Sequence, residues 1–182
     1  MKTSFYTPAE LATLGFKSIG RDCLISRKAS FYGISDITIG DNVRIDDFCI
    51  LSGHITLGSH IHISAYVALY GAEGIEMEDY TGISARSTIY SAMDDFSGDY
   101  LVGPVHPAEY THVTGGKVLV KSFSHIGANV VIFPQLTIGE GCVIGAFSLV
   151  RHDLSPWGIY YGIPAVRHKE RSRTMTALTH QP

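Results

Sequence analysis

Charged residues are scarce in this chain of 182 residues. Asp, Glu, Lys and Arg make up 17% of the sequence, whereas ordinary soluble domains carry about 25%. The net charge of −3 offers no basic surface for nucleic acid. No apolar run approaches the roughly 18 residues of a membrane-spanning helix. Hydrophobic residues, at 45%, are too frequent for a disordered chain. We therefore expect one compact domain that neither crosses a membrane nor binds nucleic acid.

Cysteines are also few. Cys23, Cys49 and Cys142 lie far apart in the sequence, which does not fit a disulfide framework. The first residues lack the apolar stretch of a secretory signal. Unpaired cysteines without a signal favour a reducing compartment, so we expect a cytoplasmic protein.

Glycine, by contrast, is abundant at 19 residues, and it accompanies a six-residue repeat. Apolar residues recur at this interval, and glycine or another small residue often follows each one. The interval fits neither a helix nor a simple hairpin series, and hexapeptide repeats are the signature of a β-helix. The apolar positions are Ile39, Ile45, Leu51, Leu57, Ile63 and Leu69, then Met77, Ile83 and Ile89, then Val120, Ile126, Ile132, Ile138, Ile144 and Val150.

Three repeats make one triangular coil of parallel strands. The first residue of each repeat points inward and stacks on its counterpart in the next coil, as Ile39 on Leu57. Glycines and small residues are expected to turn the corners. The fold class is therefore all-β, with the β-helix in residues 19–164. A short N-terminal helix in residues 1–18 starts at the capping box Thr7-Pro8-Ala9-Glu10 and runs to about Leu14. Residues 165–182 are expected to form a C-terminal helix or tail.

One corner of the predicted coil carries an extruded loop. The repeat that should follow Ile89 after six residues resumes only at Val120, which leaves a loop at about residues 91–117. Long loops on rigid scaffolds are usually functional. This loop contains the chemically versatile side chains of Asp94, Asp95, Tyr100, His106 and His112.

The coil geometry also places several side chains on one edge. Arg44, His62, Gly82, His125 and Val143 occupy the sixth position of repeats on the same side of successive coils. Neighbours along this edge should be about 4.8 Å apart. Because Gly82 has no side chain, a gap should separate the two imidazoles. The loop leaves from a different corner, so it could reach this edge on a neighbouring chain.

The last coils resemble a known family. Ile126-Gly127-Ala128-Asn129-Val130-Val131-Ile132-Phe133-Pro134, Ile138-Gly139-Glu140-Gly141 and Tyr161-Gly162-Ile163-Pro164-Ala165 are similar to the C-terminal coils of galactoside, maltose and serine acetyltransferases. This resemblance, over roughly residues 19–164, implies a left-handed β-helix. It also implies acetyl-coenzyme A as cosubstrate and a homotrimer with active sites between subunits.

Two further segments resemble a branch of that family. Asp94-Asp95-Phe96-Ser97-Gly98 and Pro156-Trp157-Gly158-Ile159-Tyr160 look like segments of enzymes associated with surface-polysaccharide (O-antigen) and nucleotide-sugar synthesis. The resemblance therefore implies an acetyltransferase that modifies an amino or hydroxyl group of a sugar, here a nucleotide-linked one. Neither the choice between amine and hydroxyl nor the length of the acyl group follows from the sequence.

Acyl transfer needs a group that takes a proton from the acceptor, and imidazole suits this task near neutral pH. In the galactoside enzymes the catalytic histidine lies in a His-Pro pair of the loop, which matches His106. When the position of that histidine is matched instead by its distance from the preceding strand, it corresponds to Asp95, and Asp94 lies beside it. We expect His62 or His106 as the base, supported by Asp94 or Asp95. If the acceptor amine binds neutral, the two aspartates only hold the sugar or its ammonium form.

The resemblance implies further roles. His62 and Ser64 fall at substrate-side positions, and His125 falls where the family often has a side chain against the pantetheine arm. The residues expected to contact substrate are Ser64, Gly82, Tyr100 and His125. The pantetheine arm needs backbone groups and small side chains, which Gly127, Ala128, Gly145 and Ala146 provide, and Arg151 and Arg167 are expected to meet the phosphates. The histidines expected to face solvent are His54, His60, His112, His152, His168 and His180.

Two other functions share this fold. Zinc-dependent relatives of γ-carbonic anhydrases need three histidines that converge on one metal between subunits. The histidines here do not match that spacing, so we expect no metal. A non-catalytic scaffold would not need small residues along a coenzyme-length face, and this chain has them.

Overall fold

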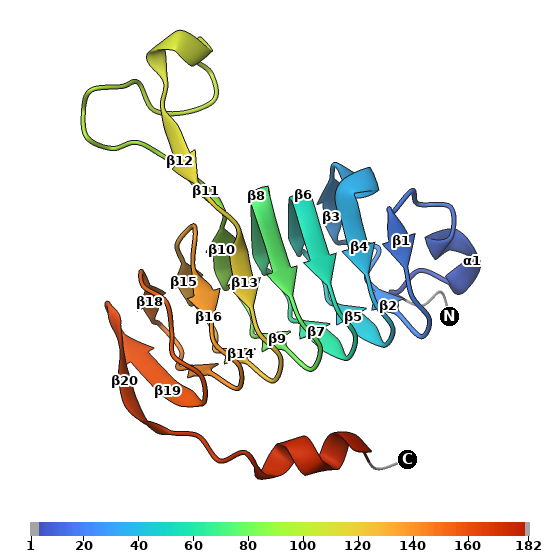
Figure 1. The fold of residues 1–182 in the computed structure, drawn as a ribbon. Helices are drawn as coiled ribbons and strands as arrows, with labels where there is room; N and C mark the ends of the chain where they lie inside the picture. The colour runs from blue at the N-terminus through green and yellow to red at the C-terminus, as the bar shows by residue number, and fades with distance from the viewer. Residues whose placement is uncertain (1–3, 181–182) are drawn as a thin grey trace.

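The computed structural model describes residues 4–180, which form a rod of stacked three-sided coils with one long projection (Figure 1). Strands on successive coils pair in parallel. Two hairpins are antiparallel: β11 with β12 in the projection, and β19 with β20 at the C-terminal end. The chain is therefore a left-handed parallel β-helix with an extruded loop, as the repeat and the resemblance predict.

The strands lie on three faces. The first face holds β1 (Ser18–Ile19), β4 (Ile37–Ile39), the second halves of β6 (Ile50–Leu57) and β8 (Ala68–Met77), β13 (Val118–Val120) and β16 (Thr137–Ile138). The second face holds β2 (Leu24–Ile25), β5 (Val43–Ile45), β7 (Ile61–Ile63), β9 (Gly82–Ile83), β14 (His125–Ile126), β17 (Val143–Ile144), β19 (Gly158–Gly162) and β20 (Ala165–Glu170). The third face holds β3 (Ser30–Tyr32), the first halves of β6 and β8, β10 (Thr88–Tyr90), β15 (Val131–Ile132) and β18 (Leu149–Val150).

The remaining elements lie outside the three faces. They are the helix α1 (Pro8–Leu11), the loop strands β11 (Ala92–Asp94) and β12 (Val113–Gly115), and the 3-10 helices η1 (Ile34–Asp36), η2 (Ala108–Tyr110) and η3 (Thr174–His180).

The core consists of three columns of apolar side chains, one behind each face. Ile63, for example, pairs with Ile45 on the coil before it and with Ile83 on the coil after it, and its side chain is fully buried. Burying one such side chain contributes about 1.5–3 kcal/mol, so the columns are a main source of stability. The six-residue repeat predicted this register correctly.

The corners differ from expectation, because most residues with a left-handed backbone are not glycine. His60, Tyr80 and Phe123 have φ near +60° at equivalent corners. Their rings stack on one another, with centroid distances of 4.6 and 5.2 Å, and this stacking offsets the cost of that backbone conformation. Many glycines serve close coil packing instead: a Cβ on Gly40 would lie 2.5 Å from the carbonyl oxygen of Gly58.

The two ends of the chain also differ in part from expectation. The capping box of α1 is present, with the Thr7 side chain accepting from the Glu10 amide, but the helix ends at Leu11 rather than near Leu14. At the other end, residues 165–170 form strand β20 because they pair with β19. Only Thr174–His180 are helical, as a 3-10 helix that runs back beside the second face (Figure 1).

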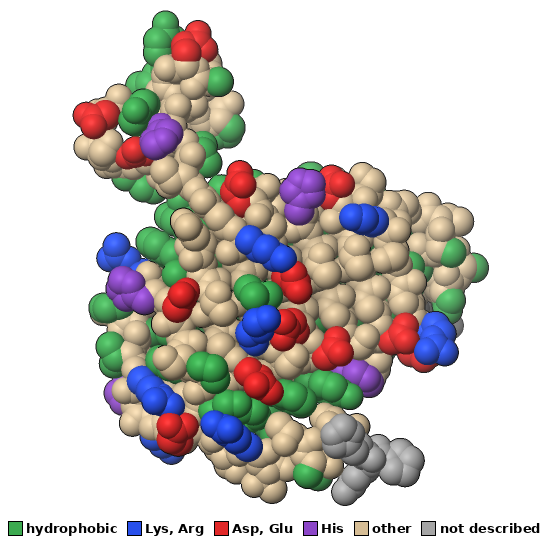
Figure 2. Space-filling view, in the orientation of Figure 1, with side chains coloured by type: hydrophobic (Ala, Val, Ile, Leu, Met, Phe, Trp, Pro, Cys, Tyr) green, Lys and Arg blue, Asp and Glu red, His purple; other side chains and the backbone are tan. Residues whose placement is uncertain are grey.

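The surface has few charges, as the composition predicts. Figure 2 shows Lys and Arg interspersed with Asp and Glu over the coils, and green apolar side chains on the projecting loop. Within residues 4–180 we find no helix that is both long enough and apolar enough to span a membrane.

Candidate active site

The second face presents the predicted row of side chains. Adjacent strands pair Arg44 with His62, His62 with Gly82, Gly82 with His125, and His125 with Val143. The repeat phase therefore gave the correct register for this row. In this row Gly82, which has no side chain, lies between the imidazoles of His62 and His125, one coil away from each.

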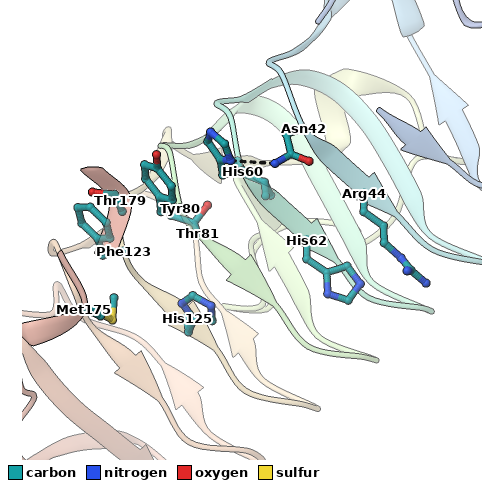
Figure 3. A pocket seen from close by; sticks show the side chains of 11 residues that line it. Asn42, Arg44, His60, His62, Tyr80, Thr81, Phe123, His125, Met175 and Thr179 are labelled. Atoms are coloured by element: carbon teal, nitrogen blue, oxygen red, sulfur yellow. Dashed lines mark hydrogen bonds between the residues drawn. The ribbon is translucent and has the colours of Figure 1, made fainter. Parts of the chain in front are cut away.

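A groove with a volume of about 450 Å³ lies over this row. Figure 3 shows its boundaries: the stacked corner residues His60, Tyr80 and Phe123 form one side, and His62 and His125 lie on the face. Met175 and Thr179, from η3, also line the groove; Met175 lies toward His125, and Thr179 lies toward Phe123. No sequence pattern indicates that the chain end forms part of this groove.

His62 has a carboxylate partner in its own chain. Its Nε2 lies 2.8 Å from Oδ2 of Asp46, and Nε of Arg44 donates to Oδ1 of the same carboxylate at 2.8 Å. Partial burial raises the pKa of Asp46, but the hydrogen bonds from His62 and Arg44 outweigh burial and hold that pKa below its usual value. Asp46 thus stays ionised and fixes the imidazole, leaving Nδ1 of His62 free. Neither Asp94 nor Asp95 bonds His62 within one chain, so their expected support of His62 from the loop of a neighbouring chain stays a prediction.

His125 lies over the gap at Gly82. A Cβ at Gly82 would stand 3.3 Å from Cδ2 and Nε2 of the imidazole. Although one side of the ring is exposed, partial burial lowers the pKa of His125, and the nearby positive charge of Arg171 lowers it further. His125 is therefore a neutral imidazole near pH 7.

A second row runs along the edge where these strands end. Backbone hydrogen bonds between successive coils place Asp46, Ser64, Ser84, Gly127 and Gly145 in line. Their amides donate to the last strand residues of the next coil. The row is polar on the N-terminal coils and has no side chains on the C-terminal coils. Ser84, a position that no sequence motif marks, is exposed at the boundary between the two halves.

The glycines of this row have a packing role of their own. A Cβ on Gly127 would lie 2.6 Å from the carbonyl oxygen of Ile144, so the close contact of two coils requires glycine there. The same absence of side chains leaves a strip of backbone, flanked by Ala128 and the exposed Ala146. Such a strip fits the amide-rich arm of coenzyme A.

The two expected phosphate contacts differ in their surroundings. The guanidinium of Arg151 lies over the ring of Phe133, with its carbon 5.5 Å from the ring centroid. Arg167 instead donates to Glu170 at 2.6 Å, so part of its charge is already compensated. Arg151 is the better candidate of the two.

The extruded loop holds its own pair of a histidine and a carboxylate. Nδ1 of His112 lies 2.9 Å from Oδ2 of Asp95, and the imidazole packs against Tyr100 at 4.8 Å between centroids. The bond to His112 and the amide of Ser97 lower the pKa of Asp95 to about 2. His112 is therefore not merely a solvent-facing residue, and Asp95 is a structural partner of His112. The hairpin of β11 and β12 creates this pair, and the repeat pattern gave no information about it.

Asp94 and His106 lie in different environments of the same loop. Oδ1 of Asp94 accepts a hydrogen bond from the amide of Gly103 at 3.3 Å, and its side chain is half-buried. His106 is exposed near the tip. The loop projects from the opposite side of the rod to β5, β7, β9 and β14 (Figure 1). One chain therefore does not bring Asp94, Asp95, Tyr100 or His106 together with His62, Ser64, Gly82 and His125.

The fold and this edge define a class of protein: a β-helix whose polar edge row continues into a strip of backbone without side chains, which suits acyl transfer from a thioester. The comparisons with known proteins agree with this class. No protein-family model matches the chain. The chain is 41% identical over 172 residues to dTDP-4-amino-4,6-dideoxy-D-glucose acyltransferase of Escherichia coli, which covers 93% of this chain and 90% of that protein.

Two further proteins extend the comparison. The structure of AntD, an N-acyltransferase from Bacillus cereus in complex with dTDP and 3-hydroxybutyryl-CoA, is 51% identical, with a TM-score of 0.95 over 98% of this chain and 95% of that one. WbbJ of Escherichia coli K12, assigned as a lipopolysaccharide biosynthesis O-acetyl transferase, is 25% identical over 145 residues, 79% of this chain and 73% of WbbJ. The chain belongs to the hexapeptide-repeat acyltransferase family.

Proposed function

We propose that this protein transfers an acyl group from an acyl-coenzyme A to the 4-amino group of a dTDP-linked 4-amino-4,6-dideoxy sugar. The observation that carries the proposal is the edge of the second face, where a polar row ends at Ser84 and the backbone strip begins at Gly127. The relatives supply the chemical identity: an acyltransferase of that sugar nucleotide is 41% identical. The sequence predicts acetylation of either an amine or a hydroxyl group of a sugar. We now restrict the acceptor group to an amine and extend the transferred group from acetyl to longer acyl groups. The zinc enzyme and the scaffold are not favoured.

Asp94 and Ser84 are the leading candidates for contact with the reacting groups. Solved AntD structures include variants S84A, S84C, S84T, D94N and D94A. This chain carries a serine and an aspartate at the same two numbers. In our proposal the Asp94 carboxylate holds the acceptor in its ammonium form, as expected for an amine acceptor.

The reaction is balanced without any further reactant. The ammonium loses a proton, the amine nitrogen attacks the thioester carbonyl, the C–S bond breaks, and the coenzyme A thiolate leaves. His62 is our candidate for the residue that takes the proton, because Asp46 holds its Nε2 and leaves Nδ1 free. We favour it over His106, which is exposed at the loop tip and not in the groove. Of the two protons that the ammonium nitrogen loses on the way to the amide, one is released to solvent and the other finally rests on the coenzyme A sulfur.

The complete site requires a second copy of the chain. The loop with Asp94 projects away from the edge with His62 and Ser84, so we propose that each loop serves the edge of a neighbour in a homotrimer. Apolar side chains on the loop support this arrangement: Phe96 is 70% exposed and Val105 is 83% exposed. Exposed apolar groups in this number mark an interface, and cyclic assembly would cover them.

We further propose that the acylated sugar serves surface-polysaccharide synthesis and that the enzyme works in the cytoplasm. The similarity to WbbJ supports the first point. The three cysteines are free and buried, which fits a reducing compartment and supports the second.

The proposed function is tested by incubating the purified protein with dTDP-4-amino-4,6-dideoxyglucose and either acetyl-CoA or 3-hydroxybutyryl-CoA. We expect release of coenzyme A thiol and a product whose mass increases by one acyl group. Protection of the amine by prior reductive methylation should abolish the reaction. No product with either donor would contradict the proposal.

A further inference from the structure

The C-terminal segment forms part of the groove. Met175 and Thr179, both half-buried, lie on η3 and line the groove together with His125 (Figure 3). They contact the groove from the side opposite the second face, so the groove is covered here and open toward Arg44 and His62. The space at His125 is therefore bounded in a way that the rest of the face is not.

Arg171 holds this segment in place. Its Nη1 donates to the carbonyl oxygens of Phe123 and Gly141, at 2.6 and 3.1 Å, which belong to two successive coils. Its Nη2 lies 3.1 Å from Sδ of Met175, and its amide donates to Trp157 at 2.8 Å. One half-buried guanidinium thus joins the coils to the Met175 side chain. Methionine is normally flexible, but here its sulfur has a fixed partner.

The position of the thioester follows from two rows of residues at the second face: the edge row that contains Ser84 and Gly127, and the adjacent row that contains Gly82 and His125. The coenzyme strip ends between Gly127 and Ser84, so the carbonyl carbon must lie at that boundary to meet an acceptor on the polar half. On one side of this point the core is closed, because Ile83 and Ile126 are buried. On the same two coils, the adjacent row has Gly82, whose missing side chain makes room for the His125 imidazole, and this imidazole lines the groove together with Met175. We therefore place the acyl substituent in this groove, past His125 and toward Met175.

We propose that Met175 sets the length of the acyl group that the enzyme transfers, and that Arg171 is the positioning residue that holds it there. This inference rests on the proposed acyltransferase function and deepens it, because it assigns the acyl-binding end of the site. A short acyl group fits in front of the methionine side chain, and each further methylene must displace it. Discrimination of about 10- to 200-fold per methylene is usual in an apolar pocket.

The test compares kcat/KM for acetyl-, butyryl- and 3-hydroxybutyryl-CoA in the unsubstituted protein, in M175A and in L178A. Leu178 is the matched control, because it lies on the same 3-10 helix, does not line the groove and is 62% exposed. We expect M175A to raise the ratio of four-carbon to acetyl donor by about tenfold or more. L178A should leave the ratio unchanged.

Two further variants separate pocket size from folding. M175L conserves volume and should keep the ratio within about twofold, and R171M should shift it in the same direction as M175A. Transfer by M175A with an unchanged donor ratio would overturn the inference while leaving the proposed function intact. A similar shift in L178A would also overturn it, by showing a general loosening of the segment. Absence of transfer by the unsubstituted protein would overturn both proposals.

Discussion

Nε2 of His62 lies 2.8 Å from Oδ2 of Asp46, and the same carboxylate also accepts from Nε of Arg44. The pair sets the orientation of the imidazole and, with Asp46 ionised, directs its free Nδ1 away from the carboxylate. The candidate general base therefore has its carboxylate partner on the preceding coil of its own chain and not in the extruded loop.

Replacement of Asp46 by Asn should impair catalysis through His62. A positioned base contributes about 10²- to 10⁴-fold, and we expect D46N to lower kcat by at least about tenfold with a smaller change in KM for acyl-CoA. The matched control is D47N, because Asp47 bonds Ser26 and Lys28 outside the groove. Equal activity of D46N and D47N, measured by thiol release, would show that Asp46 does not position His62 for catalysis.

Replacement of Gly82 by Ala should displace His125. The backbone at Gly82 lies outside the left-handed region, so alanine is tolerated there, but its methyl group would stand 3.3 Å from the imidazole. A misplacement of this order lowers kcat by about tenfold to a hundredfold. In the H125A background the same substitution should have no further effect. An additive loss in the double variant would show that Gly82 acts in some other way.

Much of this site could be predicted from the sequence, because the repeat fixes which residues share a row. The phase of the six-residue repeat directly predicts one shared row for Arg44, His62, Gly82 and His125. The contact of His62 with Asp46 joins two adjacent rows. It could not be predicted, because the phase of the repeat does not show how far a side chain extends toward the next row. No repeat runs through the loop, so the pairing of Asp95 with His112 depended on a hairpin that the pattern does not encode.

The C-terminal end was the least predictable part, for a related reason. Residues 165–170 pair antiparallel with β19, which breaks the parallel repeat. The packing of Met175 over the groove then depends on Arg171 reaching the carbonyls of Phe123 and Gly141. These contacts join residues 30 and 48 positions apart, and no local sequence signal marks them.

The loop should respond to acid through Asp95. Its pKa is lowered to about 2, so its contribution to loop stability is fully present above about pH 4. That contribution is lost as the pH falls through about 2. The chemical shift of the Ser97 amide, which donates to Asp95 at 2.7 Å, should titrate with a midpoint near 2. A midpoint near 4 would show that the bond to His112 does not form in solution.

The same pair should protect the loop from proteolysis at neutral pH. We expect D95N to accelerate cleavage by endoproteinase Glu-C after the exposed Glu109. D99N, in the same loop but with an exposed side chain, is the control and should be cleaved at the unsubstituted rate. Equal rates in D95N and D99N would mean that the Asp95–His112 pair does not order the loop.

The cysteines should be unreactive in the folded protein. Cys49 and Cys142 are fully buried and Cys23 is nearly so. Burial raises the pKa of all three thiols, that of Cys49 to about 11, which removes the reactive thiolate. Ellman's reagent should therefore label less than about one thiol per native chain and all three after denaturation. Rapid labelling of three thiols in the native protein would contradict the buried core positions.

The central claim is that Asp94 of one chain works with the edge of a neighbouring chain, and mixed oligomers test it most directly. Chains carrying D94A and chains carrying S84A, each of which we expect to be nearly inactive alone, are co-expressed with different tags and purified as hybrids. In a cyclic trimer that contains both chains, one interface in three pairs an intact Asp94 loop with an intact Ser84 edge, so we predict recovery of about a third of the unsubstituted activity. Hybrids as inactive as the two separate variants would contradict a site shared between chains.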